Sequence, residues 1–288
     1  MITEFGDERL RSLVLDYFGR DARVRQLRRA HTFGAPVFVV DFDRGLRHFR
    51  TLGSFAAGAQ VTEQSSMDLL YPARLVFHYE RLMSLGLAMT RRPVTALLLG
   101  VGGAAMWRFI RAYLPDCAPT LVDADETVVA IARRWFYLDQ SVVLDTAQRF
   151  IAATRGGYDA ILVDLYDATG PAESSEIFWT RCLDALAPGG CLATNWADFA
   201  VNSRVKPMAE SQAMVARARG LGSIFVTRRG FRDNLVQYVP TAPGNAHDRA
   251  GLLALNDVLD QFVQDRHIPD RGRGILENCV VTTHFPLG

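Results

Sequence analysis

Two carboxylates stand three residues apart in the segment DLYDATGPAE, at Asp164 and Asp167. The first directly follows the apolar run YDAILV, and Gly170 and Pro171 break the chain soon after the second. Acids placed where a buried strand reaches the surface can attract a cationic amine and accept its proton. The pair could instead be structural, with Asp164 capping a backbone amide and Asp167 starting the turn.

Two more acids close earlier apolar runs, Asp123 after PTLV and Asp145 after SVVL. Asp123 comes about twenty residues past the turn GVGG, which holds Gly100, Gly102 and Gly103. Such glycines let a ligand approach the backbone at a helix amino terminus. An acid at Asp123 could accept both ribose hydroxyls, and Asp145 could accept a hydrogen bond from an adenine amino group. Each acid could also be a helix cap, but together they favour a nucleoside pocket.

The glycine turn lacks the full G-x-G-x-x-G spacing, and no P-loop lysine follows it. Both signatures bind phosphates, of a dinucleotide in one case and of a nucleoside triphosphate in the other. The sequence therefore favours an adenosylmethionine-type ligand.

The elements that must position these acids alternate strand and helix through the centre of the chain. Continuous apolar runs, separated by helical patterns, occur at 94–100, 119–125, 141–145, 158–164 and 190–196. Runs at 223–228 and 234–240 should close the sheet as an antiparallel hairpin. Strands without polar alternation indicate a parallel sheet covered on both faces, so we predict an α/β fold with a doubly wound, mostly parallel, seven-stranded sheet. Ligands of such sheets bind beyond the carboxyl ends of the strands, where the acids lie.

The pattern of the first seventy residues predicts a separate structural unit. Residues 1–30 read as one or two amphipathic helices, and short runs at 36–42, 45–52 and 59–65 predict a small antiparallel sheet. Residues 72–90 follow a helical period, and 248–265 predict a helix in the tail. We therefore expect an N-terminal domain over 1–70 and a nucleoside-binding domain over 71–288.

Bulk composition argues against several classes of protein. Lys and Arg number 32 against 31 Asp and Glu, a net charge of +1, so neither nucleic acid nor an acidic membrane is expected as a partner. The amino terminus has no apolar core of signal-peptide length and no run is long enough to span a membrane, which favours a cytoplasmic protein. The cysteines and histidines lack the spacing of a metal site, so no metal is expected.

The segment from Asp164 to Glu173 resembles the active-site loop of the spermidine synthase family of aminopropyltransferases, which reads D-S-x-D-P-x-G-P-A-E. Similarity continues through LDALAPGG, VDADETVV and LDTAQRF, and upstream through EQSSMDLLYPARLVFHYERLM. This resemblance implies a Rossmann-like fold of the class I adenosylmethionine-dependent methyltransferase type. It also implies a homodimer.

The resemblance further implies a reaction without a metal, in which an aminopropyl group passes from decarboxylated S-adenosylmethionine to a putrescine-type amine. Asp164 would be the general base, Asp167 would hold a substrate nitrogen, and Tyr79 would place its hydroxyl near the amine. Gln64 would line the pocket, while Asp123 and Asp145 would bind the ribose and the adenine.

One departure from the family leaves alternatives open. The family motif G-G-G-D-G-G aligns with GVGGAA, so Gly103 stands where the family has an Asp that contacts the donor tail. If Gly103 leaves space there, intact S-adenosylmethionine could bind and a methyl group be moved instead. A non-catalytic nucleoside-binding protein is a third reading, although a structural turn would not need both Asp164 and Asp167.

Overall fold

The computed structural model places most of the chain. The residues that it describes are 3–4, 8–19, 22–31, 36–56, 60–90, 93–167, 170–171, 175–197, 202–228, 234–241 and 279–283. The tail helix expected at 248–265 and the loop between the predicted hairpin strands lie outside these ranges.

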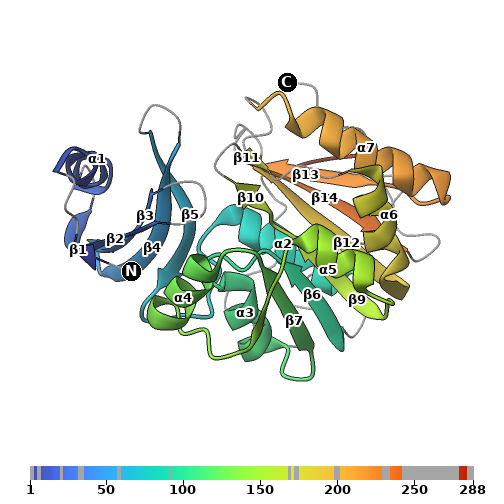
Figure 1. Cartoon of the computed structure of the whole chain (residues 1–288), viewed down its shortest axis with the longest axis horizontal. Coiled ribbons are helices and arrows are strands. Elements are labelled where there is room, and N and C mark those ends of the chain that lie inside the picture. The colour runs from blue at the N-terminus through green and yellow to red at the C-terminus, as the bar shows by residue number, and fades with distance from the viewer. Residues whose placement is uncertain are drawn as a thin grey trace.

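The N-terminal unit is a five-stranded antiparallel sheet with strands in sequence order (Figure 1). Its strands are β1 (Thr3–Glu4), β2 (Arg23–His31), β3 (Pro36–Arg44), β4 (Arg47–Ala56) and β5 (Gln60–Asp68). Helix α1 (Glu8–Gly19) covers one face, where Val14 and Phe18 pack with Phe38 and Phe42 of β3. The three predicted strands are confirmed, and the proposed boundary at residue 70 falls in the connection to the next sheet.

The prediction of helix throughout residues 1–30 is wrong from Arg23 onward, where the chain forms β2. The pairing of β2 with β3 shifts register between Val24 and Gln26, which interrupts the alternation expected of a strand. Beyond this bulge Arg28 points inward and is buried. Its charge is paired with Asp41, whose carboxylate lies 3.2 Å from the guanidinium, a compensation that no local pattern reveals.

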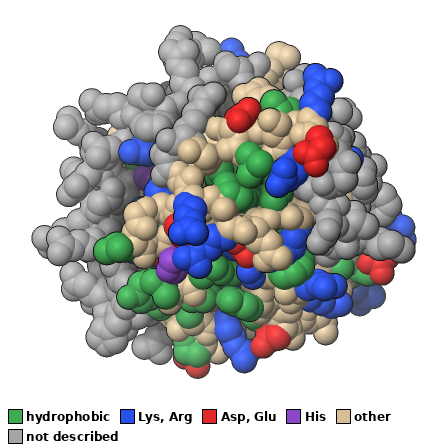
Figure 2. Space-filling view, turned by 90° about the vertical axis from the view of Figure 1, so that its left-hand side faces the viewer, with side chains coloured by type: hydrophobic (Ala, Val, Ile, Leu, Met, Phe, Trp, Pro, Cys, Tyr) green, Lys and Arg blue, Asp and Glu red, His purple; other side chains and the backbone are tan. Residues whose placement is uncertain are grey.

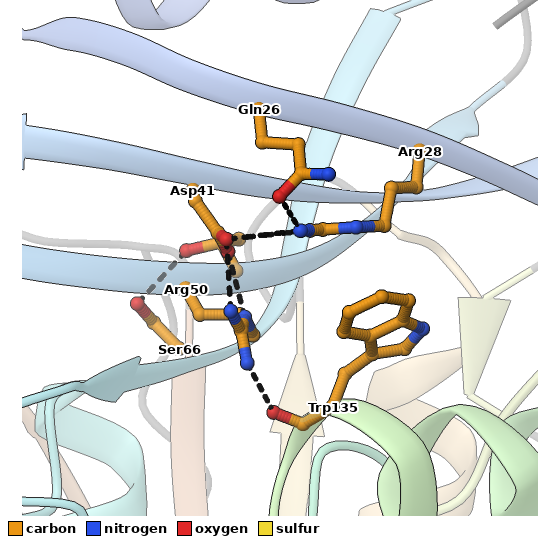
Figure 3. Close-up of polar contacts among 7 residues, drawn as sticks. Gln26, Arg28, Asp41, Arg50, Ser66 and Trp135 are labelled. Atoms are coloured by element: carbon orange, nitrogen blue, oxygen red, sulfur yellow. Dashed lines mark hydrogen bonds and ion pairs between the residues drawn. The ribbon is translucent and has the colours of Figure 1, made fainter. Parts of the chain in front are cut away.

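Arg50 of β4 joins this sheet to helix α4 (Glu126–Trp135) (Figure 3). Its guanidinium binds Asp41 on one side and donates to the main-chain oxygen of Trp135, at 2.9 Å, on the other. Arg28 lies over the Trp135 ring, 4.0 Å from its centroid. Cations at a helix C-terminus interact favourably with the helix dipole, so Asp41 and its two arginines connect the two units.

The second sheet has eight strands among the described residues, in the order β15-β13-β14-β12-β9-β6-β7-β8. Their bounds are β6 (Thr95–Leu99), β7 (Ala118–Asp123), β8 (Val142–Leu144), β9 (Tyr158–Val163), β12 (Leu186–Ala197), β13 (Ile224–Arg228), β14 (Asn234–Pro240) and β15 (Cys279–Thr282). The neighbouring strands β8, β7, β6, β9 and β12 pair in parallel. The remaining pairs, from β12 through β14 and β13 to β15, are antiparallel. The α/β prediction and the β13–β14 hairpin are confirmed. The predicted count of seven strands is wrong by one, because the short strand β15 adds an eighth at the edge of the sheet.

Alternate residues of these strands face two different helical layers, as a doubly wound sheet requires. Leu98 of β6 and Leu162 of β9 pack in one apolar cluster with α2 (His78–Ala88) and α3 (Ala105–Tyr113). Their neighbours Leu97 and Ile161 pack in a second cluster with the helices of the other face. Those helices are α5 (Ala147–Ala153), α6 (Glu176–Asp184) and α7 (Val205–Ala218).

Basic side chains (Lys and Arg) lie among acidic and apolar ones on the face in Figure 2. In the N-terminal sheet, Arg25 of β2 is 2.6 Å from the Asp43 carboxylate. Among the described helices, none has both the length and the apolar character that crossing a membrane would need. The four cysteines are buried and unbridged.

Candidate active site

Four neighbouring parallel strands, β9, β6, β7 and β8, end side by side at one edge of the large sheet. The amide of Asp164 donates to Leu99 at the end of β6, at 2.9 Å, and the amide of Asp145 donates to the main-chain oxygen of Asp123, at 3.2 Å. Asp164, the glycine turn, Asp123 and Asp145 therefore follow one another along this edge. The topology brings together residues that the sequence separates.

Gly100 allows the glycine turn to pass directly against Asp164. Its φ is +92°, and a Cβ atom built on it would lie 2.1 Å from the main-chain oxygen of Asp164. Any other residue would meet both this backbone contact and the left-handed conformation. The close contact of β6 and β9 at this point thus depends on glycine.

A narrow cavity of ≈ 40 Å³ lies between the glycine turn and α2. Six of the predicted site residues line it: Gln64, Tyr79, Gly100, Gly102, Gly103 and Asp164. Apolar walls are supplied by residues such as Met83, Leu98 and Leu162. The volume has room for about three or four water-sized groups. It therefore suits a slender chain and not a ring.

The Asp164 carboxylate is fixed by an amide side chain from the neighbouring strand. Asn195 of β12 donates to its Oδ1 at 2.8 Å, and Asn195 is itself oriented by Asn234 of β14, at 3.0 Å. Burial raises the pKa of Asp164, while the hydrogen bonds from Asn195 and Tyr79 favour its ionised form and offset part of that rise. A carboxylate so placed can accept a proton from a bound amine.

Tyr79 lies between Asp164 and strand β5. Its hydroxyl donates to the main-chain oxygen of Gln64 at 3.0 Å, and the hydroxyl is also in hydrogen-bonding contact with Asp164. A phenol has a single proton and can donate to only one of these oxygens at a time. Burial, with the negative charge of Asp164, raises the pKa of Tyr79 well above its usual value, so the hydroxyl stays protonated. The side chain of Gln64 donates to Ser54 at 3.1 Å.

The space expected beside Gly103 is filled. A Cβ atom on Gly103 would lie 2.6 Å from the Ser65 hydroxyl oxygen and 2.7 Å from its Cβ. The expectation that the missing Asp side chain leaves open space is therefore wrong in the direction of that side chain, although Gly103 still lines the cavity. Ser65 was not recognised because it lies on β5, in the other sheet.

Asp123 and Asp145 lie at adjacent strand ends, and neither is a helix N-cap. Asp125 caps α4 and Thr146 caps α5. The Asp123 carboxylate accepts from the amides of Val101, at 2.9 Å, and Asp125, at 2.9 Å. It thus holds the glycine turn in place, and burial raises its pKa. Asp145 accepts from the amide of Thr146 at 2.8 Å.

Asp167 falls in the two-residue strand β10 (Tyr166–Asp167), which pairs with β11 (Gly170–Pro171). Its side chain lies outside the described part of the structure.

Three residues of the site were not anticipated. Glu80, directly after Tyr79, is 2% exposed and lines the cavity. Asn195 holds Asp164, as described above. Arg108 of α3 is buried and donates to the main-chain oxygens of Pro72, Gly103 and Phe136, so that it ties the glycine turn to two neighbouring segments. A polar residue inside an otherwise apolar helix or strand was the only local signal for each.

Comparison with known proteins finds relatives of the central part of the chain. A family model of the spermine/spermidine synthase domain matches residues 76–218. The polyamine aminopropyltransferase of Chromobacterium violaceum is 39% identical over 142 residues, which cover 47% of this chain and 54% of that protein. The chain thus spans about half the length of this curated relative.

Two solved structures share the fold. A probable spermidine synthase from Corynebacterium glutamicum superposes with a TM-score of 0.64 at 17% identity, covering 80% of this chain and 86% of that chain. A spermidine synthase in complex with the transition state analogue AdoDATO gives a TM-score of 0.51 at 14% identity, covering 79% of this chain and 85% of that chain. At such identities these matches show the fold alone.

Proposed function

We propose, from the premise that residues 76–218 match the spermine/spermidine synthase domain family, that the chain is an aminopropyltransferase. Its donor is decarboxylated S-adenosylmethionine and its acceptor is a putrescine-type amine. The observation that carries the proposal is the cavity in which the glycine turn, Tyr79 and the Asp164 carboxylate meet. Acidic side chains in a narrow cavity suit a slender aliphatic chain that carries an ammonium group.

The reaction is a displacement at the carbon next to a sulfonium sulfur. The amine nitrogen forms a bond to that carbon as the carbon–sulfur bond breaks, methylthioadenosine leaves, and the nitrogen gives up a proton. Such a step requires mainly that the nitrogen be unprotonated and aligned with the carbon. Asp164 takes the proton in this scheme, because its carboxylate lies in the cavity and is held in one orientation by Asn195.

The nucleoside half of the donor occupies the sheet edge outside the narrow cavity. Gly100, Gly102 and Gly103 let it approach the backbone before α3, and Asp123 and Asp145 at the next strand ends receive its ribose and adenine. The Asp123 carboxylate accepts backbone hydrogen bonds from Asp125, Val101 and Gly102, and a carboxylate has about four lone-pair sites, so acceptor capacity is left for a ribose hydroxyl. Asp167 and Tyr79 orient the amine, and a homodimer is part of the proposal.

The proposal is tested by incubating the purified protein with decarboxylated S-adenosylmethionine and putrescine. Methylthioadenosine and an aminopropylated amine should appear in equal amounts. Intact S-adenosylmethionine in place of the decarboxylated donor should give neither product. Methyl transfer from the intact donor, with no turnover of the decarboxylated one, would establish the methyltransferase alternative.

A further inference from the structure

The charged side chains that line the cavity are, among the described residues, Glu80 and Asp164, and both are acids. No Lys, Arg or His of the described part faces the cavity with them. Two carboxyl groups in a confined apolar space cannot both ionise cheaply without a cation between them. The cavity is therefore built to receive positive charge, and Asp164 is only one of its two acids.

Glu80 also has a structural contact, which must be separated from any role in binding. Its Oε2 atom accepts a hydrogen bond from the amide of Phe77 at 3.0 Å, as the third helical residue of a capping box does at the start of α2, and the amide of Val76 also donates to its carboxylate. A capping carboxylate does not need burial, yet this one is 2% exposed and borders the cavity. The cap alone does not explain that position.

The groups around Glu80 do not neutralise it locally. Arg108 of α3 acts on it through its charge, but the described hydrogen bonds of its guanidinium go to three main-chain oxygens. Asp164 acts on it with the opposite sign, and Tyr79 precedes it on the same helix. Burial, the largest effect, together with Asp164 raises the pKa of Glu80 to about 7. A bound cation would return this pKa toward its usual range.

We propose that Glu80 binds the ammonium end of the donor's aminopropyl arm inside the cavity and thereby selects a decarboxylated donor. The inference rests on the proposed function and adds to it the residue that distinguishes the two possible donors by their side arms. The narrow cavity has room for an unbranched arm of this size. An additional carboxylate on that arm would be desolvated beside Glu80 and Asp164 without a described cation to pair with it, and would be rejected.

The variant Glu80→Gln separates the two roles, because glutamine keeps the capping hydrogen bond and removes the charge. Isothermal titration calorimetry at pH 8 should measure the affinity of wild type and variant for three probes. Decarboxylated S-adenosylmethionine carries the ammonium arm, intact S-adenosylmethionine carries the arm with a carboxylate, and methylthioadenosine has no arm.

The expected result is that Glu80→Gln weakens decarboxylated donor binding by about 10- to 100-fold, the loss typical of a charged hydrogen bond. Methylthioadenosine should bind both proteins equally well, within about 2-fold. The variant should also prefer the decarboxylated over the intact donor less strongly than wild type does. For wild type, affinity for the decarboxylated donor should fall as the pH is lowered from 8 to 6, and the variant should show a smaller fall.

Two contrary results have different meanings. If methylthioadenosine and the decarboxylated donor bind wild type, and Glu80→Gln changes neither affinity, then Glu80 is only a helix cap and the inference is wrong while the proposed function stands. If neither probe binds wild type, the proposed function fails and the inference fails with it.

Discussion

The main-chain oxygen of Asp164 lies against the Cα atom of Gly100, so closely that a Cβ at that position would come within 2.1 Å of it. This contact joins the candidate base to the glycine turn and sets the position of both strand ends. Changes to either partner should therefore affect the proposed nucleoside site and the candidate base together.

Gly100→Ala should remove donor binding and lower the free energy of unfolding by more than about 2 kcal/mol, since it adds a backbone clash to an unfavourable φ. Denaturant unfolding and methylthioadenosine titration would measure both effects. Gly45→Ala is a matched control, because Gly45 also has a positive φ, +61°, but has no atom within 4 Å of the added Cβ. It should cost about 1 kcal/mol and leave binding intact. Equal costs for the two variants would show that the contact with Asp164 is relaxed in solution.

Ser65 and Gly103 should behave as a coupled pair. Gly103→Ala alone places a Cβ 2.6 Å from the Ser65 hydroxyl oxygen and should be destabilising. Ser65→Gly removes both nearest atoms, so the double variant should recover a coupling energy of about 1 kcal/mol or more in a double-mutant cycle of unfolding free energies. Strict additivity of the two changes would contradict the packing described here.

Asn195→Ala should shift the pH dependence of the reaction. Asn195 donates to the Asp164 carboxylate and favours its ionised form, so its removal raises the pKa of Asp164 further above the usual range. Activity that requires ionised Asp164 should then be lost at a higher pH on the acid side of the kcat/KM profile. An unchanged acid limb would show that this limb reports another group.

Ionisation of the buried Glu80 carboxyl group should lower the free energy of unfolding as pH rises. Its folded-state pKa of about 7 lies above the usual 4.5, so its contribution is fully present below pH 4.5 and is lost as pH rises through 7. The loss in the free energy of unfolding is up to about 3 kcal/mol. Glu80→Gln, with the exposed Glu126→Gln as control, should therefore gain stability relative to wild type between pH 5 and pH 8 in urea unfolding. Parallel pH curves for all three proteins would contradict a buried, perturbed Glu80.

Asp41 should be important for the junction between the two sheets, because it neutralises Arg28 and Arg50 in a buried position (Figure 3). Asp41→Asn leaves the buried Arg28 and the largely buried Arg50 without their anion and should cost about 3 to 5 kcal/mol in unfolding free energy. Breaking the exposed pair of Lys206 and Glu210 with Glu210→Gln should cost less than about 0.5 kcal/mol. A small loss for Asp41→Asn would mean that water reaches these arginines.

The strands of the large sheet were predictable because each is a continuous apolar run buried on both faces. Strand β2 was not, since its buried Arg28 depends on Asp41 and on the Trp135 ring, which come from β3 and α4. The short strand β15 was missed because its four residues lie far along the chain from β13, with which they pair.

The same distinction holds for the site. Asp123, Asp145 and Asp164 could be placed together because parallel topology alone brings strand ends to one edge. Glu80 and Asn195 come from a helix and from a neighbouring strand, and their approach to Asp164 depends on tertiary packing. The filling of the space beside Gly103 by Ser65 likewise depends on contact between the two sheets.

The central claim is that Asp164 takes the proton from the attacking amine, and single-turnover transfer by Asp164→Asn tests it most directly. With saturating decarboxylated S-adenosylmethionine and putrescine, methylthioadenosine release should slow by about 100- to 10,000-fold, while methylthioadenosine itself still binds. The exposed Asp116→Asn should react at the rate of wild type. Release by Asp164→Asn at the wild-type rate would contradict the account.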